Sequence, residues 1–399
     1  MTRTITILGA TGSVGLATLD LVSTAAEGEF SLTALTAHTK ARELAELALR
    51  FRPRFTALAD STRAHLLEAA LAGSGLRWGA GPAAVLEAAS MDADWTMAAI
   101  VGAAGLAPTL SAVKRGRIVA LANKEALVCA GRLFMECAQQ SGAVILPVDS
   151  EHNAIFQALG GVAASRVRRI ILTASGGPFR TASREVMALA SARDAVAHPV
   201  WSMGAKISVD SATMMNKGLE VIEACHLFGL PPEKVDVIVH PESIVHGLVE
   251  HVDGGLLAQM GSPDMRIPIA HALGWPDRIA TSVSRLDLPA LGRLTFETPD
   301  PERFPALDLA RSAFLAGGAS PIILNAANEV AVDAFLNGHV GFLDIAAVVA
   351  ESLERGEGLA LGPIDDFDAV YAADHAARQL AAGQVAARAR RGGTAARGV

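Results

Sequence analysis

The N-terminal part of the chain carries a glycine-rich segment, Gly9-Ala-Thr-Gly-Ser-Val-Gly15, whose residue types suit the binding of a dinucleotide. It follows a strand-like run over residues 5–8 and opens a helical pattern over residues 14–21. Glycines permit a tight turn close to a pyrophosphate, and the helix start offers free N–H groups and a positive dipole end. Thr11 and Ser13 add hydroxyl donors. The alternative is a strand-to-helix turn without a ligand, but its place in the first such unit favours binding.

The end of the second predicted strand, residues 32–36, indicates which dinucleotide is bound. Proteins that bind NAD usually end this strand with Asp or Glu, which binds the ribose 2′-OH. This chain has His38, Thr39 and Lys40 instead. Such side chains suit a 2′-phosphate, so the sequence predicts NADPH. Lys40 alone is equally well explained as a solvated lysine at a helix start, and the missing carboxylate is the firmer observation.

Carboxylates near the middle of the chain are candidate metal ligands. Asp149 and Glu151 follow a strand-like run, and in an extended segment their side chains face the same way. Asn216 and Glu220 are four residues apart and share a face on a helix, so Glu220 can point where the other carboxylates point. Carboxylate oxygens select Mg²⁺ or Mn²⁺ over zinc. Alternatively, Asp149 caps the helix that follows, and one residue can be both a helix cap and a metal ligand.

Two further segments contain groups that can bind phosphate. Ser175-Gly-Gly-Pro178 follows a strand-like run over residues 170–173, where small residues with free N–H groups can form an anion-binding nest. An ordinary turn is the alternative. Ser211, Asn216 and Lys217 lie in the segment richest in reactive side chains and can also hold a phosphate.

Trp201 and Met203 are flanked by Pro199 and Gly204. This combination is typical of a mobile apolar lid. Packing of the two side chains in a core is an equally good reading of the spacing alone.

The elements that must position these residues fall into distinct segments. Strand-like and helical runs alternate through the first part of the chain, which is typical of a parallel sheet. We therefore expect an α/β protein with a Rossmann-like NADPH-binding domain at 1–149 and a central α+β catalytic domain at 150–285, with a lid near 197–206. A linker (286–305), a C-terminal helical bundle (306–382) and a disordered Arg-rich tail (383–399) follow. Within the central domain, runs at 235–239, 244–250 and 256–259 predict an antiparallel meander.

The composition limits the class of protein. The 399 residues include 34 Lys and Arg and 41 Asp and Glu, for a formal net charge of −7. This balance argues against nucleic acid as the main partner, but permits an anionic small substrate. Three cysteines fit a reducing cytoplasm better than a disulfide framework. No signal-peptide pattern and no clean apolar run of about 18 residues is present, so no membrane association is expected.

Seven motifs, several of them long, follow one another along the chain. They are the glycine segment, Ala122-Asn-Lys-Glu125, Pro147-Val-Asp-Ser-Glu-His-Asn153, Ala174-Ser-Gly-Gly-Pro-Phe-Arg180, Lys206-Ile-Ser-Val-Asp-Ser-Ala-Thr-Met-Met-Asn-Lys-Gly-Leu-Glu220, Gly261-Ser-Pro-Asp-Met-Arg266 and Leu324-Asn-Ala-Ala-Asn-Glu329. Together these motifs resemble those of the 1-deoxy-D-xylulose 5-phosphate reductoisomerase family, and the likeness extends to about residue 380. The resemblance implies a homodimeric enzyme of the non-mevalonate isoprenoid pathway, which uses NADPH and a divalent cation (Mg²⁺, Mn²⁺ or Co²⁺) to convert its substrate to 2-C-methyl-D-erythritol 4-phosphate.

By position in these motifs, the resemblance implies roles for individual residues. The metal ligands would be Asp149, Glu151 and Glu220, and these residues would share catalysis with Lys124 and His198. The substrate would contact Lys124, Ser150, Glu151, Ser175, His198, Trp201, Ser211, Asn216, Lys217 and Glu220, with the phosphate falling mainly to Ser175, Ser211, Asn216 and Lys217. NADPH would contact Thr11, Gly12, Ser13, Val14, Asn123, Glu125 and Gly204. The residues that follow the second predicted strand, His38, Thr39 and Lys40, are further expected contacts.

The chain departs from the family pattern at two places. After the second strand, Gly, then Lys or Arg, then Asn is common in the family, whereas this chain has His38, Thr39 and Lys40. Ala205 stands where a basic residue is common.

Two alternative functions are another NADPH-dependent dehydrogenase, acting on a small phosphorylated or semialdehyde substrate, and a non-catalytic dinucleotide sensor. Neither requires three carboxylates together with a phosphate pocket.

Overall fold

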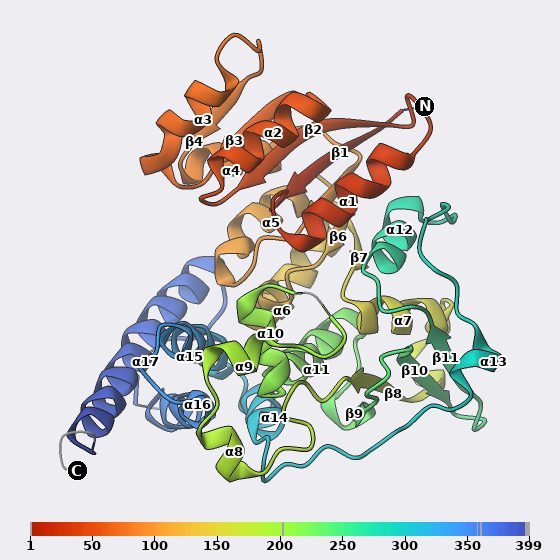
Figure 1. Ribbon diagram of the computed structural model, residues 1–399. Coiled ribbons are helices and arrows are strands. Elements are labelled where there is room, and N and C mark those ends of the chain that lie inside the picture. The colour runs from red at the N-terminus through yellow and green to blue at the C-terminus, as the bar shows by residue number, and fades with distance from the viewer. Residues whose placement is uncertain (1, 202, 357, 360, 396–399) are drawn as a thin grey trace. The chain divides into compact units, whose positions relative to one another are not determined.

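The computed structural model describes residues 2–201, 203–356, 358–359 and 361–395, with side chains to residue 390. The chain divides into two units (Figure 1). Unit 1 comprises Met1–Ala126, Phe134–Asn153 and Asp264–Ser284, and unit 2 comprises Leu127–Leu133, Ala154–Pro263 and Arg285–Val399. The expected boundary at residue 285 therefore differs from the observed division, because residues 264–284 belong with the N-terminal sheet.

Unit 1 is built on a seven-stranded sheet in the order β4-β3-β2-β1-β5-β6-β7, in which every neighbouring pair is parallel. The strands are β1 (Arg3–Leu8), β2 (Phe30–Ala37), β3 (Phe55–Leu58), β4 (Trp78–Ala80), β5 (Trp95–Ala98), β6 (Ile118–Leu121) and β7 (Val144–Pro147). Their inner residues are buried, as expected of a parallel sheet covered by helices on its faces. The predicted Rossmann-like parallel sheet is confirmed.

Helices follow most of these strands in the chain. They are α1 (Ser13–Thr24), α2 (Ala41–Phe51), α3 (Ala64–Leu71), α4 (Pro82–Ser90), α5 (Leu106–Val113), α6 (Lys124–Ser141) and α7 (Ser150–Leu159), with short 3-10 turns η1 (Ser61–Arg63) and η2 (Ala103–Gly105). α12 (Arg266–Gly274) joins unit 1 from much later in the chain. Its carbonyl groups at Ala272 and Leu273 accept hydrogen bonds from the Trp95 indole (2.9 Å) and the Arg3 guanidinium, respectively.

Unit 2 contains a four-stranded mixed sheet in the order β11-β10-β8-β9. Its strands are β8 (Val167–Ala174), β9 (Val235–Val239), β10 (Val245–His251) and β11 (Leu256–Met260). β8 and β9 are parallel, whereas β10 pairs antiparallel with both β8 and β11. The expected meander of the last three strands is wrong, because β8 lies between β9 and β10. The helical crossover from β8 to β9 favours parallel pairing.

The helices of unit 2, apart from the short helix Leu288–Leu291, which has no buried residue, share one hydrophobic core with this sheet. They are α8 (Arg184–Ala188), α9 (Ala192–Val196), α10 (Ala205–Ala212), α11 (Met215–Phe228), α13 (Leu288–Leu291), α14 (Ala306–Ala316), α15 (Ser320–Leu336), α16 (Phe342–Gly356) and α17 (Phe367–Ala395), with the 3-10 turns η3 (Ala164–Arg166) and η4 (Pro232–Lys234). Leu172 of β8, Leu219 of α11 and Leu324 of α15 all belong to this core. The C-terminal helices therefore pack as part of unit 2.

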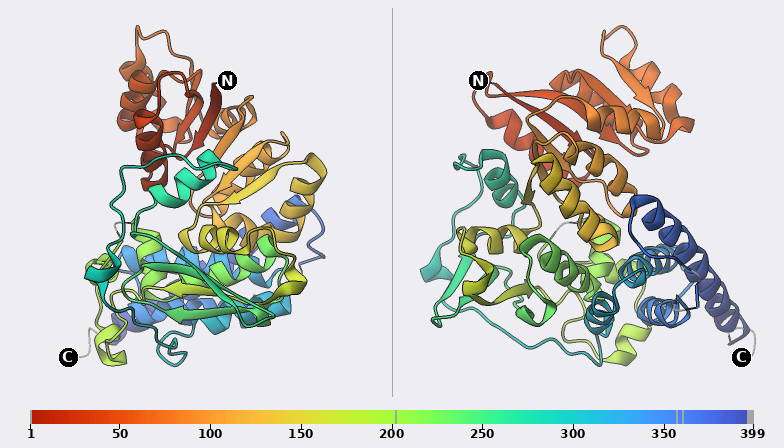
Figure 2. Two further views of the ribbon diagram at one scale, coloured as in Figure 1. Left: turned by 90° about the vertical axis from the view of Figure 1, so that its right-hand side faces the viewer. Right: turned by 180° about the vertical axis from the view of Figure 1, so that it is seen from behind.

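The helix α17 corrects the prediction of a disordered tail from residue 383. It runs beside α15 and continues to Ala395 (Figures 1 and 2). The segment is rich in alanine, which favours a helix. Arg388 also pairs with Asp344 (3.0 Å) and Glu351 (2.5 Å) of α16, so the tail has tertiary contacts that its composition did not reveal. Residues 396–399 lie outside the described residues.

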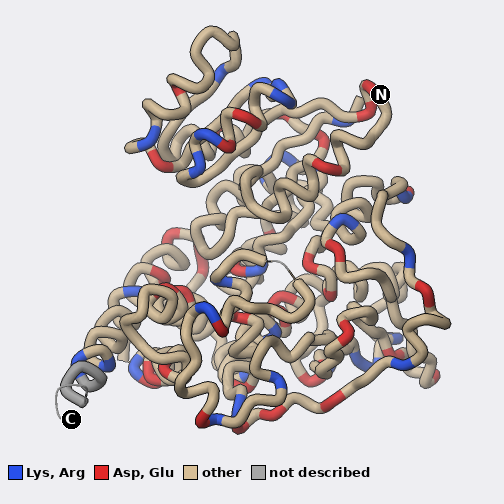
Figure 3. Tube along the Cα trace, viewed as in Figure 1, with Lys and Arg blue, Asp and Glu red and all other residues tan. Residues whose placement is uncertain are grey.

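Charged residues of both signs are interspersed along the trace of each unit (Figure 3). Cys129, Cys137 and Cys225 are free thiols. Among the described residues, no helix has both the length and the apolar character needed to cross a bilayer.

Candidate functional site

The turn between β1 and α1 is closed by two glycines. Gly9 has a φ of +92°, and a Cβ added there would lie 2.6 Å from the carbonyl oxygen of Ala99. A Cβ on Gly15 would lie 2.4 Å from the oxygen of Gly9. Gly12 occupies the N-cap of α1 without a side-chain capping bond, so the helix start keeps backbone N–H groups that no side chain of the cap covers. This is the cradle that a pyrophosphate requires.

The same turn lies at the point where the strand order of the sheet reverses. β1 pairs with β2 on one side and with β5 on the other, and ligands of such sheets bind outside the carboxyl ends of the strands at this point. The amide of Asn123 donates to the carbonyls of Ile100 (2.6 Å) and Gly102 (2.9 Å), and to Glu125 (3.1 Å). Asn123 thereby joins the loop after β5 to the start of α6. The expected NADPH contacts of unit 1 thus all lie in loops or first helical turns that follow strands at one edge of the sheet, namely Thr11, Gly12, Ser13, Val14, Asn123 and Glu125, whereas Gly204 is in unit 2.

The acidic segment after β7 is organised by local contacts. Asp149 pairs with the ammonium of Lys124, and both side chains are largely buried. The two residues meet because β6 and β7 are parallel neighbours, with Leu121 opposite Pro147. Ser150 donates to Glu151 (2.6 Å). The expectation that Asp149 and Glu151 lie in one extended segment is wrong, because α7 begins at Ser150 and only Asp149 precedes it.

Asn153 ties this acidic segment to α12. Its backbone N–H donates to the carbonyl of Asp149 (2.8 Å). Its side-chain nitrogen lies 2.8 Å from the Pro147 carbonyl and 3.1 Å from Nδ1 of His271. Burial, and secondarily the charge of Arg278, lower the pKa of His271 to about 4. The imidazole is therefore neutral near pH 7, and its Nδ1 can accept from the amide.

In unit 2, Ser175 and His198 are brought into contact. Nε2 of His198 lies 2.8 Å from the Ser175 hydroxyl. Nδ1 accepts from the backbone N–H groups of Val200 (3.1 Å) and Trp201 (2.9 Å), so the ring hydrogen of the neutral form is on Nε2. Burial lowers the pKa of His198 below its ordinary value. The neutral ring thus links the backbone of residues 200–201 to the Ser175 hydroxyl.

The turn at Ser175 also packs on α10. A Cβ added to Gly177 would lie 2.9 Å from the carbonyl oxygen of Ser211, and the φ of Gly177 is +64°. Only glycine fits this approach without strain. Ser175 and Ser211 therefore belong to adjoining backbone segments. Gly204 is exposed and forms the N-cap of α10.

Helix α11 presents three of the predicted site residues on one face. Asn216 and Lys217 both donate to the carboxylate of Glu220. The shared face of Asn216 and Glu220 is therefore confirmed. The helix begins after Met214, which is buried and has a φ of +64°. Such a conformation costs about 1–3 kcal/mol in a residue other than glycine and commonly occurs at functional sites.

The segment proposed as a lid has no regular secondary structure in its described residues from Ala197 to Gly204, where Ser202 lies outside the description. Trp201 lies near His246 of β10, with ring centroids 6.1 Å apart. His246 is buried, and its Nε2 is 3.2 Å from the carbonyl of Gly261. Lys206, at the start of α10, pairs with Asp210 at 2.8 Å.

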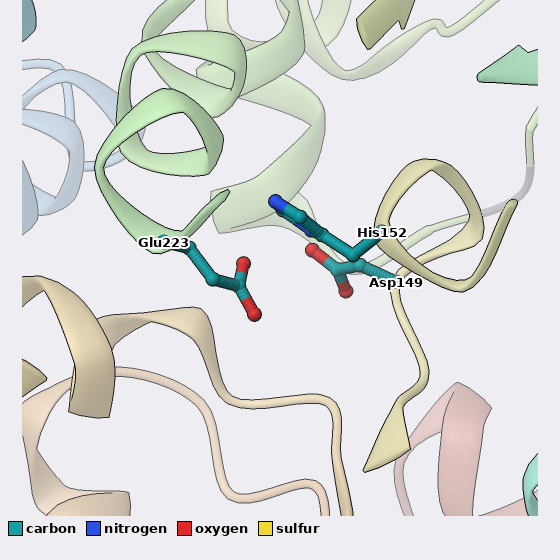
Figure 4. A group of neighbouring side chains, drawn as sticks. All are labelled: Asp149, His152 and Glu223. Atoms are coloured by element: carbon teal, nitrogen blue, oxygen red, sulfur yellow. The ribbon is translucent and has the colours of Figure 1, made fainter. Parts of the chain in front are cut away.

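The sequence did not identify two buried titratable residues, one in each unit, that lie near predicted site residues in the chain. His152 is buried on α7, where one ring nitrogen lies within 4.8 Å of a carboxylate oxygen of Asp149. Glu223 is buried on α11, one turn after Glu220. Figure 4 shows how Asp149 and His152 lie in the segment that begins α7, and the side chain of Glu223 on α11. The spacing Asp149-x-x-His152, one turn of a helix, is the signal that could have found His152.

The motifs at residues 261–266 and 324–329, in which no site residue was predicted, make structural contacts. Arg266 pairs with Asp264 (2.7 Å) and with Asp20 of α1 (3.1 Å), which joins α12 to α1. The amide of Asn328 on α15 donates to Asp210 (2.8 Å), which joins α15 to α10.

A parallel sheet with a glycine turn at its switch point, followed by segments rich in carboxylate, hydroxyl and amide side chains, is typical of dinucleotide-dependent α/β enzymes. Comparison with known proteins identifies the family. The model of 1-deoxy-D-xylulose 5-phosphate reductoisomerase matches residues 5–131, the model of its C-terminal domain matches 145–228, and a further model, the DXP reductoisomerase C-terminal domain, matches 260–380. The chain belongs to the 1-deoxy-D-xylulose 5-phosphate reductoisomerase family.

Individual relatives support this assignment along the whole chain. The reductoisomerase of Rhodospirillum centenum is 58% identical over 385 residues, which is 96% of this chain and 95% of the relative. That of Caulobacter vibrioides is 54% identical over 387 residues, with 96% and 97% covered. The solved structure of the Zymomonas mobilis enzyme in complex with NADPH has a TM-score of 0.89 at 50% identity, with 96% and 99% covered. A reductoisomerase in complex with NADPH, fosmidomycin and magnesium has a TM-score of 0.91 at 42% identity, with 96% and 98% covered.

Proposed function

We propose that this chain rearranges 1-deoxy-D-xylulose 5-phosphate and reduces the rearranged product to 2-C-methyl-D-erythritol 4-phosphate, as a step of non-mevalonate isoprenoid biosynthesis. The reaction depends on NADPH and on a divalent cation. The observation that carries this function is family membership along nearly the whole chain. Another dehydrogenase that shares only the N-terminal sheet would not match over residues 145–228 and 260–380.

The first unit supplies the residues for NADPH. The tight approach at Gly9 and Gly15 and the start of α1 at Ser13 fit a pyrophosphate. When bound, NADPH supplies the hydride. The contacts that we propose come from Thr11, Gly12, Ser13, Val14, His38, Thr39, Lys40, Asn123 and Glu125 of unit 1 and from Gly204 of unit 2.

The metal ligands that we propose are Asp149, Glu151 and Glu220. Their carboxylate oxygens suit Mg²⁺ or Mn²⁺. The pairing of Asp149 with Lys124 and of Glu220 with Lys217 supports the proposal, because each carboxylate already faces a positive charge. A bound divalent cation supplies Lewis-acid polarisation of substrate oxygens. Lys124 would then turn from Asp149 to the polar end of the substrate, alongside Ser150.

The phosphate ligands that we propose are Ser175, Ser211, Asn216 and Lys217. The contact of Ser175 with His198 supports a link between this pocket and the segment 197–206, which we propose to act as a lid. His198 and Trp201 would cover the substrate, and binding of the remote phosphate would favour closure and exclude water from the reacting carbons.

We also propose that the enzyme is a homodimer in the cytoplasm. The edge strand β11 supports the dimer, because Leu256 (53% exposed) and Leu257 (52%), which point to opposite faces, are both exposed. An exposed apolar edge strand is a common site of association between chains. The three free thiols fit a reducing compartment.

The function is tested by following NADPH absorbance with purified chain, 1-deoxy-D-xylulose 5-phosphate and Mg²⁺. We expect oxidation of NADPH that depends on both substrate and metal, and formation of 2-C-methyl-D-erythritol 4-phosphate. Full activity after treatment with a chelator would contradict the metal assignment. Absence of NADPH oxidation in the complete mixture would contradict the function.

A further inference from the structure

The loops after β2 and β3 lie next to each other in unit 1. The two strands are parallel neighbours, with Ala37 opposite Leu58, so both loops leave the same edge of the sheet. The backbone N–H of Asp60 donates to the carbonyl of His38 (3.0 Å). Nη1 of Arg63, the last residue of η1, donates to the carbonyl of Thr39 (3.3 Å). Arg63 therefore lies against the segment that the sequence alone associates with the 2′-phosphate.

The guanidinium of Arg63 is held from one side. Its Nε lies 3.3 Å from Oδ2 of Asp60, and its Nη1 is bonded to Thr39. Hydrogen bonds from Thr62, chiefly the one from its side chain (2.6 Å), hold the pKa of Asp60 below its ordinary value. The ionised carboxylate fixes the guanidinium, and among the described residues Nη2 has no hydrogen-bond partner. The Arg63 side chain is 52% exposed.

The surrounding charges favour an anion. Lys40, at the N-cap of α2, is exposed and makes no ion pair within the described part of the chain, and His38 is exposed as well. Arg63 and Lys40 outweigh the carboxylate of Asp60, and in the first turn of α2 the charge of Glu43 is balanced by that of Arg42. The N-terminus of α2 adds its partial positive charge. The free Nη2 of Arg63 carries two N–H groups that can donate to phosphate oxygens, and the guanidinium keeps its charge throughout the physiological pH range.

We propose that Arg63 is a specificity-determining residue that binds the 2′-phosphate of NADPH, together with Lys40, and so makes the enzyme prefer NADPH to NADH. The inference rests on the proposed function and extends it. In dinucleotide-binding sheets the ribose of the adenosine lies at the end of the strand that corresponds to β2, and an arginine near this strand end accommodates the phosphate. Here that arginine comes from η1, after the next strand, and the absence of a carboxylate at the end of β2 leaves room for it.

The test measures binding without turnover. NADPH and NADH are titrated separately into the full chain, without substrate or metal, and the fluorescence of the nicotinamide is followed. In Arg63→Ala we expect the dissociation constant for NADPH to rise about tenfold. This effect is at the lower end of the range for hydrogen bonds to charged groups, because the Arg63 side chain is half exposed. The constant for NADH should stay within about twofold, which also shows that the variant is folded. Arg63→Lys keeps the charge but loses the planar guanidinium. Its dissociation constant for NADPH should lie between those of the wild type and Arg63→Ala.

Arg50→Ala is the matched control. Arg50 lies in the last turn of α2, about 15 Å along the helix from Lys40, and its loss removes the same charge from the same unit. It should leave the ratio of the two constants unchanged. An unchanged ratio in Arg63→Ala overturns the role of Arg63 while the function of the enzyme stands, and an equal change in Arg50→Ala assigns the effect to general surface charge. A wild-type chain with no preference for NADPH overturns both this inference and the cofactor of the proposed function.

Discussion

At the scale of single residues, the candidate site consists of charged groups that already compensate one another. Glu220 accepts from Asn216 and Lys217, and Asp149 pairs with Lys124. Buried carboxylates require such partners, because an unpaired charge in the interior costs several kcal/mol. If these residues bind metal and phosphate as we propose, binding would exchange their internal partners for external ones, and the same side chains would serve stability before binding and recognition after it.

Replacing Glu220 by Gln should separate metal-dependent turnover from binding of the dinucleotide. The amide keeps the shape of the side chain but removes the negative charge, so it cannot neutralise a cation. We expect kcat/KM at saturating NADPH to fall on the order of 100-fold, because a metal contributes several kcal/mol to the transition state. The dissociation constant for NADPH should be unchanged in a fluorescence titration.

Glu233→Gln, an exposed carboxylate of η4 in the same unit, is the control and should retain wild-type kinetics. Thermal unfolding of Glu220→Gln must be followed as well, because loss of the charge leaves Lys217 without its carboxylate. A folded Glu220→Gln variant with normal Mg²⁺-dependent turnover would remove Glu220 from the metal site.

The His198 segment should loosen when the pH falls. Burial lowers the pKa of His198 below its ordinary value of 6.5. As the pH falls, the unfolded chain therefore binds the proton at a higher pH than the folded chain does. The free energy of unfolding then decreases as the pH falls from about 6.5 through the folded-state pKa, and the neutral ring is fully stabilising only above this range. Protonation also places a hydrogen on Nδ1, against the N–H groups of Val200 and Trp201.

Urea denaturation of the wild type, of His198→Gln and of a control, His65→Gln, between pH 5 and pH 8 would measure this effect. His65 is exposed on α3. We expect the decrease in unfolding free energy toward acid pH to be smaller in His198→Gln and unchanged in His65→Gln. Parallel pH dependence of the wild type and His198→Gln would show that His198 does not titrate in this way.

At the scale of elements, parallel strands bring distant loops together at their carboxyl ends. The contacts of Lys124 with Asp149 and of Arg63 with Thr39 both arise because each pair follows adjacent strands. A helix remote in sequence also restrains the acidic segment. His271 of α12 contacts the side chain of Asn153, and the backbone N–H of Asn153 bonds to the carbonyl of Asp149. The orientation of the acidic segment thus depends on a helix that is remote in sequence.

Replacing His271 by Ala should therefore weaken metal binding with little effect on NADPH. The Asn153 amide would lose one acceptor, and the start of α7 would lose a restraint on its carboxylates. We expect the Mg²⁺ concentration for half-maximal activity to rise about tenfold, as is usual for residues that orient metal ligands. His271→Asn places an oxygen near the position of Nδ1 and should restore part of the metal affinity. Equal Mg²⁺ requirements in His271→Ala and the wild type would limit His271 to a packing role.

How far the sequence alone predicts these elements depends on their length and on the distance between partners. The glycine turn, the parallel sheet and the shared face of Asn216 and Glu220 follow local rules of spacing, and the structure confirms them. Strand β4 has only three residues, Trp78–Ala80, too few to show a period. The contact between Asn153 and His271 and the place of β8 between β9 and β10 depend on pairings between distant segments, which periodicity does not encode.

At the scale of the whole molecule, association through β11 can be tested directly. Leu257→Asp places a charge on the exposed edge strand, where it would be desolvated in a dimer. We expect sedimentation to show a shift from dimer to monomer. Leu189→Asp, at an 87% exposed leucine just after α8, is the control and should leave the assembly unchanged. A Leu257→Asp variant that remains dimeric at low micromolar concentration would exclude β11 as the interface.

The return of α12 to unit 1 also has a consequence for biosynthesis. Trp95, which is fully buried, and Arg3 both donate to carbonyls of a helix that begins at Arg266. The N-terminal sheet therefore emerges from the ribosome well before the helix that completes it, and all four strands of the unit 2 sheet are made in between. A fragment that ends near residue 153 would leave the indole of Trp95 without its acceptor on α12. Folding of the dinucleotide-binding unit thus finishes late, after the chain has already supplied Glu220 and the residues of unit 2 that we propose to bind phosphate.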